Sequence, residues 1–388
     1  MPLRTFRPAG TTMSAPDVVI VGGGVIGLSI AWRAAASGLR VTLVDPNPGH
    51  GASWAAAGML APVTEVHPGE ERLVPLNLAS TERYPSFIAE LEDATGMDAG
   101  YRASGTVVVA RDADENEVLA DLYGLQRDLG LRSERLGARE CRALVPGLGR
   151  LVRGGILVAG DHAVDNRALV AALLEMCRHM EVELVATSVV EISTSDHGAT
   201  GVVAADGTRL PSGEVVVCAG CWSGDIAGIP PDAVPVRPVK GQLLHLRASD
   251  PSLLTRTVRG LDVYIVPRGD GRLVVGATVE EQGFDVTATA EAVYTLLRDA
   301  YELVPAILEA ELVEVAVGLR PGSPDNAPLL GPTALPGLSL ATGHYRNGIL
   351  LVPATADALA RLLISGEVPD IIAPFSPSRF ISPERIAG

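Results

Sequence analysis

The sequence contains few cysteines and few aromatic residues, and it has fewer basic than acidic residues. Only 4 cysteines occur in 388 residues, which is too few for a disulfide scaffold and fits a reducing compartment such as the cytoplasm. The 31 Lys and Arg are outnumbered by 46 Asp and Glu, giving a net charge of −15. Nucleic acids and anionic membranes bind clustered basic residues, so we expect neither as a partner.

Long apolar runs are also missing. The run from Val18 to Trp32 has only 15 residues and contains four glycines, whereas a membrane-spanning helix needs about 20 apolar residues. The first 16 residues lack the apolar segment of a signal peptide, and Met13 is an alternative start to Met1. We therefore expect a cytoplasmic protein in which residues 1–12 form a tail.

The composition that remains, with 47% hydrophobic and 20% charged residues, is typical of a globular protein of two or three domains. Near its start, the chain has the pattern of a βαβ unit. Val18–Val21 is a β-branched run that suits a buried parallel strand. A helical pattern follows over 28–35, and a second strand over 40–44 ends at Asp45.

Three glycines of this unit have the spacing of a dinucleotide site. Gly22, Gly24 and Gly27 allow a tight turn, close approach of a pyrophosphate and close packing of helix on strand. The free N–H groups of the helix start then face the anion, and Asp45 can accept hydrogen bonds from ribose hydroxyls while disfavouring a 2′-phosphate. The unit predicts a dinucleotide but does not by itself separate NAD from FAD.

Later segments indicate which dinucleotide is bound. The residues Gly-Ala-Ser-Trp-Ala-Ala-Ala-Gly-Met-Leu at 51–60, Gly-Leu-Arg-Pro-Gly at 318–322 and Gly-His-Tyr-Arg-Asn-Gly-Ile at 343–349 resemble segments of the D-amino-acid oxidase family of FAD enzymes. The segments 263–268 and 271–277 also match, and the resemblance extends from Asp17 to about Ile364. Within that family, the chain is most similar to the glycine-oxidising members that serve thiamine biosynthesis.

The resemblance implies an α/β fold in which a Rossmann-like FAD-binding domain receives an inserted α+β substrate domain with an antiparallel sheet. It places the FAD-binding domain at 13–84, 154–234 and 317–372, and the substrate domain at 85–153 and 235–316. The segments 1–12 and 373–388 are expected to be tails. A homotetramer is implied by the resemblance alone.

The resemblance also implies which residues contact a non-covalently bound FAD. They comprise the phosphate loop, the ribose acid, the 51–60 segment, one residue beside the adenine and the turn against the pyrimidine edge of the flavin. These residues are Gly22, Gly24, Val25, Ile26, Gly27, Asp45, Pro46, Ala52, Ser53, Ala57, Gly58, Met59, Val189, His344, Tyr345, Arg346, Asn347, Gly348, Ile349 and Leu350.

Three residues match substrate-binding positions of the family. Arg320 matches the arginine that holds the substrate carboxylate, because a guanidinium can bind a carboxylate through two hydrogen bonds. Arg346 and Tyr264 match a second arginine and a tyrosine beside the substrate. No catalytic side chain is expected, because hydride transfer to the flavin needs no side-chain base. Asp262 departs from a histidine of the family pattern, which leaves its role open.

The implied reaction converts glycine, sarcosine or a small D-amino acid to the 2-oxo acid, ammonia and hydrogen peroxide, with dioxygen as acceptor. A functional link to a thiazole synthase follows from the thiamine pathway. Two alternatives remain: a dehydrogenase of D-amino acids or sarcosine that uses another electron acceptor, and a non-catalytic FAD-binding module.

The C-x-x-C segment and the histidines do not indicate a metal or redox site. Cys218-Ala219-Gly220-Cys221 spells C-x-x-C, but it has no second cysteine pair for zinc and resembles a turn that covers FAD. The seven histidines are scattered without the spacing of metal ligands. We expect no metal and no redox disulfide.

Overall fold

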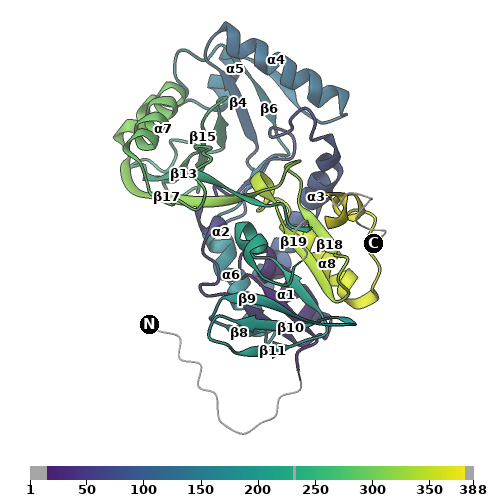
Figure 1. The fold of residues 1–388 in the computed structure, drawn as a ribbon. Helices are drawn as coiled ribbons and strands as arrows, with labels where there is room; N and C mark the ends of the chain where they lie inside the picture. The colour runs from purple at the N-terminus through teal and green to yellow at the C-terminus, as the bar shows by residue number, and fades with distance from the viewer. Residues whose placement is uncertain (1–14, 230–232, 381–388) are drawn as a thin grey trace.

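The computed structural model describes residues 15–229 and 233–380, which form two main sheets with a cavity between them (Figure 1). The expected tail at 1–12 lies outside the described residues. In the view of Figure 1, one sheet occupies the lower part of the molecule and the other the upper part.

The lower sheet has six strands in the order β18-β19-β12-β1-β2-β8. All neighbours are parallel except β18 and β19, and the burial of every residue in β1 and β2 agrees with the β-branched run in the sequence. The strands are β1 (Val18–Val21), β2 (Val41–Val44), β8 (Glu183–Val185), β12 (Val215–Val217), β18 (Leu329–Pro332) and β19 (Leu338–Thr342).

Helices cover one face of this sheet, and a small three-stranded sheet packs on the other. The helices are α1 (Val25–Ala36), α3 (Val74–Thr95), α6 (Asn166–His179) and α8 (Val352–Ser365). The small sheet consists of β9 (Val189–Ser195), β10 (Gly198–Ala204) and β11 (Arg209–Pro211). This arrangement is the expected Rossmann-like layer structure.

The upper sheet has eight strands in the order β17-β13-β16-β15-β14-β4-β6-β5. Its pairs are antiparallel, as expected, apart from the parallel pair β14 and β4. The strands are β4 (Thr106–Ala110), β5 (Glu134–Gly137), β6 (Gly154–Val158), β13 (Arg237–Arg247), β14 (Thr257–Arg259), β15 (Tyr264–Pro267), β16 (Arg272–Gly276) and β17 (Glu311–Gly322).

One face of the upper sheet packs against helices α5 (Ala138–Leu144) and α7 (Ala290–Leu303), and the other face packs in part against α4 (Ala113–Asp128). The rest of that second face, on β13, β15 and β17, looks into the cavity. Between the two sheets, the short helix α2 (Ala52–Ala55) and the pair β3 (Met59–Leu60) and β7 (His162–Ala163) complete the wall.

Sheet membership differs from the expected domain limits by several residues. The strands β6 and β17 belong wholly to the upper sheet, although the expected limits were 153 and 316. Helix α3 continues past the expected limit at 84, and its Phe87 and Leu91 are buried in the lower core with Trp32. An unbroken helix must pack as one rod, so its second half stays with its first.

The described part of the C-terminal segment is also more ordered than the sequence indicated. The short 3₁₀ helices η6 (Ala373–Phe375) and η7 (Pro377–Phe380) follow α8. Phe375 is buried in the lower core, and Arg379 forms an ion pair with Asp325 at 2.9 Å. Residues 373–380 are therefore packed structure rather than a tail.

Candidate active site

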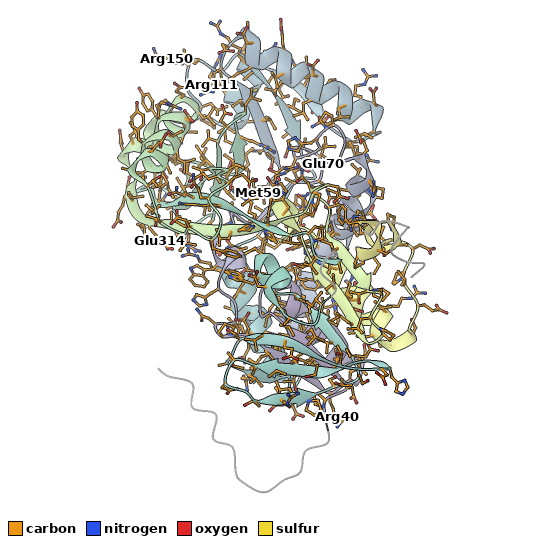
Figure 2. All side chains as sticks on the ribbon, in the orientation of Figure 1. Arg40, Met59, Glu70, Arg111, Arg150 and Glu314 are labelled. Carbon is orange, nitrogen blue, oxygen red and sulfur yellow. The ribbon has the colours of Figure 1, made fainter. Side chains whose placement is uncertain are left out.

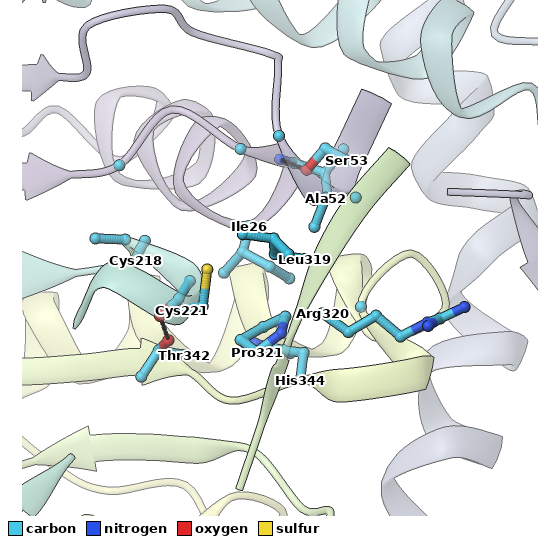
Figure 3. Close-up of a pocket in the computed structure, with 18 of the residues that line it drawn as sticks. Ile26, Ala52, Ser53, Cys218, Cys221, Leu319, Arg320, Pro321, Thr342 and His344 are labelled. Atoms are coloured by element: carbon cyan, nitrogen blue, oxygen red, sulfur yellow. Dashed lines mark hydrogen bonds between the residues drawn. The ribbon is translucent and has the colours of Figure 1, made fainter. Parts of the chain in front are cut away.

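A cavity of about 680 Å³ lies where the two sheets meet, and both sheets contribute to its wall (Figure 3). Its size is that of a typical cofactor or ligand site. The predicted residues line this cavity with three exceptions, Gly27, Asn347 and Leu350. Segments that are far apart in the sequence thus meet at one site, as the resemblance implied.

The phosphate loop joins β1 to the start of α1 at one end of the cavity. Gly22 has φ +109°, a conformation that favours glycine. At Gly24, which precedes α1, the N-cap residue has no side chain to cap the helix, so the N–H groups there other than that of Val25 can bind an anion. Gly27 lies outside the wall because its role is packing: a Cβ there would come within 1.9 Å of the Gly22 carbonyl oxygen.

Two side chains hold this loop in place. The Asp45 carboxylate accepts hydrogen bonds from the backbone N–H groups of Gly23 and Asn47, each at 2.7 Å. The Ser53 hydroxyl accepts one from the N–H of Val25 at 3.0 Å. The predicted ribose acid therefore also shapes the loop, which the sequence pattern alone did not indicate.

The C-x-x-C segment lines the cavity as a buried turn beside α1. Its two thiols are free and buried, and burial raises the pKa of Cys221 to about 12. The turn is held by Thr342, whose hydroxyl donates to the Gly220 carbonyl at 3.0 Å. Thiols with raised pKa values are weak nucleophiles.

At the other end of the cavity lies Arg320, on β17. Its Nη1 donates to the Thr278 carbonyl at 3.1 Å, and no carboxylate pairs with Arg320 among the described residues. The guanidinium lies over Gly241 of β13, where a Cβ would come within 2.3 Å of Nη1. Glycine at this position therefore makes room for a cation whose charge is not neutralised by the protein.

Tyr264 is the next polar side chain on the same face of the sheet. Its hydroxyl lies against Gly276 of the neighbouring strand, where a Cβ would come within 2.5 Å of it. Burial raises the pKa of Tyr264 to about 12, with the charge of Arg320 acting in the opposite direction. The phenol is therefore neutral at physiological pH and can donate a hydrogen bond.

Arg346 also lines the cavity, but its charge already has a partner. Its Nη2 lies 2.7 Å from Oε1 and 2.5 Å from Oε2 of Glu70. Glu70 accepts a further hydrogen bond from the Asn326 side chain at 2.7 Å. Figure 2 shows Glu70 and Met59 near the middle of the molecule. Of the two predicted arginines, Arg320 is the one whose charge is available to a ligand.

The turn at 343–350 brings His344 to the wall, whereas Asn347 and Leu350 lie behind it. Burial lowers the pKa of His344 to about 3, so its imidazole is neutral and contacts the Thr355 hydroxyl at 3.2 Å. The Leu350 carbonyl accepts a hydrogen bond from Ser80 at 2.7 Å. Neither His344 nor Tyr264 is suited to act as a general base near neutral pH.

Two acidic residues near this end were missed by sequence reasoning. Glu65 lines the cavity and pairs with Arg259, and Glu70 pairs with Arg346. No local motif marks the two acidic residues, because these partners lie far away in the chain. The residue whose role was left open, Asp262, is exposed and does not line the cavity.

Within residues 15–229 and 233–380, no helix is long and apolar enough to cross a bilayer. Within the same ranges, no group of three or more His, Cys, Asp or Glu side chains is placed to hold a metal ion.

Comparison with known proteins identifies the family. The family model described as FAD dependent oxidoreductase matches residues 17–362. The chain belongs to this family. FAD is therefore its cofactor, and the wall fits it: a helix start that follows a glycine turn lies at one end, and the small residue Ala57 lines the wall further along.

Relatives in this family cover nearly all of the chain. The chain is 36% identical over 94% of its length to the bifunctional protein ThiO/ThiG of Synechocystis, and it spans about half of that protein (54%). It is 36% identical to the glycine oxidase of Pseudomonas aeruginosa, covering 93% of this chain and 98% of that protein. The crystal structure of glycine oxidase from Geobacillus kaustophilus superimposes with a TM-score of 0.89 at 36% identity, covering 95% of this chain and 99% of that one.

Proposed function

We propose that this FAD-dependent oxidoreductase is a glycine oxidase. In the overall reaction, glycine, water and dioxygen give glyoxylate, ammonia and hydrogen peroxide. The observation that carries the substrate class is Arg320, a cavity-lining guanidinium without a carboxylate partner in the described chain. Such a cation needs an anion of the ligand, and a carboxylate matches its two parallel N–H donors.

The residues around Arg320 orient a small substrate. Tyr264 stays neutral and donates a hydrogen bond to the same carboxylate, while Arg320 supplies the charge. The glycines at 241 and 276 hold both side chains close to the sheet. FAD, when bound, supplies the two-electron acceptor. The contribution of the chain is to hold the substrate Cα in one orientation, which is a large part of catalysis in such sites.

The wider role is proposed from the relatives. Glycine oxidases of similar length and a fused ThiO/ThiG protein are both similar to this chain, which supports a role in thiamine biosynthesis with a thiazole synthase as functional partner. Dioxygen as acceptor, a cytoplasmic location and a homotetramer belong to the same proposal. We also propose the two-domain division, with limits shifted to follow the two sheets.

The proposal is tested by mixing the purified yellow protein with glycine, sarcosine and D-alanine without oxygen and then admitting air. Bleaching by glycine that reverses in air with release of peroxide is the expected result. Bleaching that air does not reverse would favour a dehydrogenase, and no bleaching by any of the three would contradict the proposal. Arg320→Ala is expected to weaken glycine binding about a hundredfold while the protein keeps its FAD.

A further inference from the structure

A carboxylate lies beside the proposed substrate position on the side opposite Arg320. Glu65 lines the cavity, and its side chain is only 11% exposed. Its Oε1 is held by Nη1 of Arg259 at 3.1 Å, whereas no hydrogen bond to Oε2 occurs between described residues. The other acidic residues on the wall, Asp45 and Asp225, belong to the lower part of the cavity, beside the phosphate loop and the C-x-x-C turn.

The register of the upper sheet defines where Glu65 stands. Arg259 on β14 is the direct cross-strand partner of Tyr264 on β15. On its other side, Tyr264 pairs with Gly276, which in turn pairs with Leu243 of β13. Directly paired residues of antiparallel strands project from the same face of the sheet. Arg259, with Glu65 attached, therefore flanks Tyr264 on one side.

Arg320 flanks Tyr264 on the other side. Gly241 lies two residues from Leu243 on β13, so both face the cavity, and the Arg320 guanidinium lies over Gly241. Because Gly241 and Gly276 have no side chains, the Arg320 guanidinium and the Tyr264 hydroxyl can lie directly against the sheet. The carboxylate of Glu65, the neutral phenol of Tyr264 and the guanidinium of Arg320 thus follow one another across a single sheet face.

This order matches the polar groups of an amino acid, which carries a carboxylate and an amino group on the same carbon, Cα. We propose that Glu65 binds the amino group of the substrate through Oε2 while Arg320 binds its carboxylate, so that the two side chains together select ligands that carry both groups. This inference rests on the proposed function, because it concerns the same cavity. Arg259 acts as a positioning residue: besides holding Glu65, it donates to the Thr64 carbonyl at 2.9 Å.

The loop that carries Glu65 is fixed from behind. The buried Asp161 carboxylate accepts hydrogen bonds from the backbone N–H groups of Val63 and Thr64, at 3.2 and 2.7 Å, and from the Thr64 hydroxyl at 2.6 Å. A charge held in this way is preorganised and needs little rearrangement when a ligand arrives.

The test compares glycine with acetate, a carboxylate that lacks the amino group, as ligands of the FAD-loaded wild type and Glu65→Gln. Acetate binding is measured from the change in flavin absorbance, and glycine binding from the concentration dependence of bleaching without oxygen. We expect Glu65→Gln to weaken glycine binding about tenfold or more, because a charge-assisted hydrogen bond is lost. Acetate binding should stay unchanged or become tighter, and Glu65→Asp should recover part of the glycine affinity.

A matched control is Glu281→Gln, the same chemical change at a carboxylate that is 60% exposed, which should leave both ligands unaffected. Equal weakening of glycine and acetate in Glu65→Gln would overturn the inference, since it would show a purely structural role. Unchanged glycine binding would also overturn it.

The two proposals can fail separately. If glycine bleaches the wild-type flavin but binds Glu65→Gln equally well, only the role of Glu65 fails. If glycine perturbs the wild-type spectrum without bleaching it, the oxidase proposal fails, and the same comparison of the two variants still decides the role of Glu65. If glycine neither binds nor bleaches, both are overturned.

Discussion

Arg346 and Glu70 form an ion pair at the cavity wall, with 2.5 Å between Nη2 and Oε2, although 276 residues separate them in the chain. The pair is largely shielded from water, since the two side chains are only 24% and 12% exposed. A shielded pair is costly to break from one side, because it leaves an uncompensated charge. The pair gives the two arginines of the cavity different roles.

We expect Arg346→Met to affect mainly stability and Arg320→Met to affect mainly substrate binding. Arg346→Met should lower the free energy of unfolding by about 2 kcal/mol, with a smaller rise in KM for glycine than Arg320→Met causes. Denaturant unfolding and steady-state kinetics of both variants are the measurements. In the double variant Glu70→Gln/Arg346→Met, the losses should be less than additive. Additive losses, or a larger KM effect from Arg346→Met, would contradict this assignment and favour Arg346 as the substrate ligand.

Gly241→Ala should displace the Arg320 guanidinium without disrupting the sheet. The added Cβ would come within 2.3 Å of Nη1, the flexible end of the side chain. We expect KM for glycine to rise about tenfold through loss of bidentate contact, with FAD still bound. Gly213→Ala is the control, because no atom lies within 4 Å of the Cβ it would add. A KM equal to that of the control would contradict the steric argument.

Asp45→Ala should weaken FAD binding by about ten- to hundredfold. The carboxylate accepts hydrogen bonds from the N–H groups of Gly23 and Asn47 at 2.7 Å, so its loss should loosen the phosphate loop as well as remove the proposed ribose contact. Titration of the apoprotein with FAD, followed by flavin fluorescence, measures the change. Asp206→Ala, at an exposed turn residue that does not line the cavity, is the control. Retention of FAD at wild-type affinity would show that the loop keeps its shape without Asp45.

His344 should make stability depend on pH in the acidic range. Its pKa is lowered to about 3 by burial, whereas an unfolded histidine titrates near 6.5. Between these values only the unfolded chain binds the proton, so stability falls as pH decreases, by up to about 1.4 kcal/mol per pH unit from this group. His344→Gln removes the contribution. Unfolding of both proteins between pH 7.5 and 5 in excess FAD should therefore show a wild-type advantage that shrinks at low pH. A constant difference would contradict a neutral His344.

The sequence was sufficient for those parts of the fold and site that are encoded locally. The β-branched run at 18–21 and the glycines after it predicted β1 and the loop, because strand burial and turn geometry depend on neighbouring residues. Arg320 was placed at the cavity by the resemblance of the segment around it to the family. Tyr264 was placed there by the resemblance, since a tyrosine in a strand most often only packs.

Features that depend on contacts across the chain were not accessible in this way. Glu65 and Glu70 gain their positions from Arg259 and Arg346, and nothing in their local sequence marks this. The domain limit expected at 84 falls within α3 for a related reason. Its apolar residues face α1 and α8 over several turns, and Pro85 within the helix resembles a boundary when only the sequence is considered.

Helix α3 also affects the entropic cost of FAD binding, because it orders part of the cavity wall in advance. Two of its hydroxyl groups reach the turn that borders the cavity: Ser80 donates to the Leu350 carbonyl at 2.7 Å, and Tyr84 to the Ile349 carbonyl at 2.9 Å. Both hydroxyl-bearing side chains are fully buried. The turn is therefore held by hydrogen bonds for which water does not compete. The conformational entropy of this part of the wall is therefore lost during folding rather than when FAD binds, which leaves more of the contact energy as affinity.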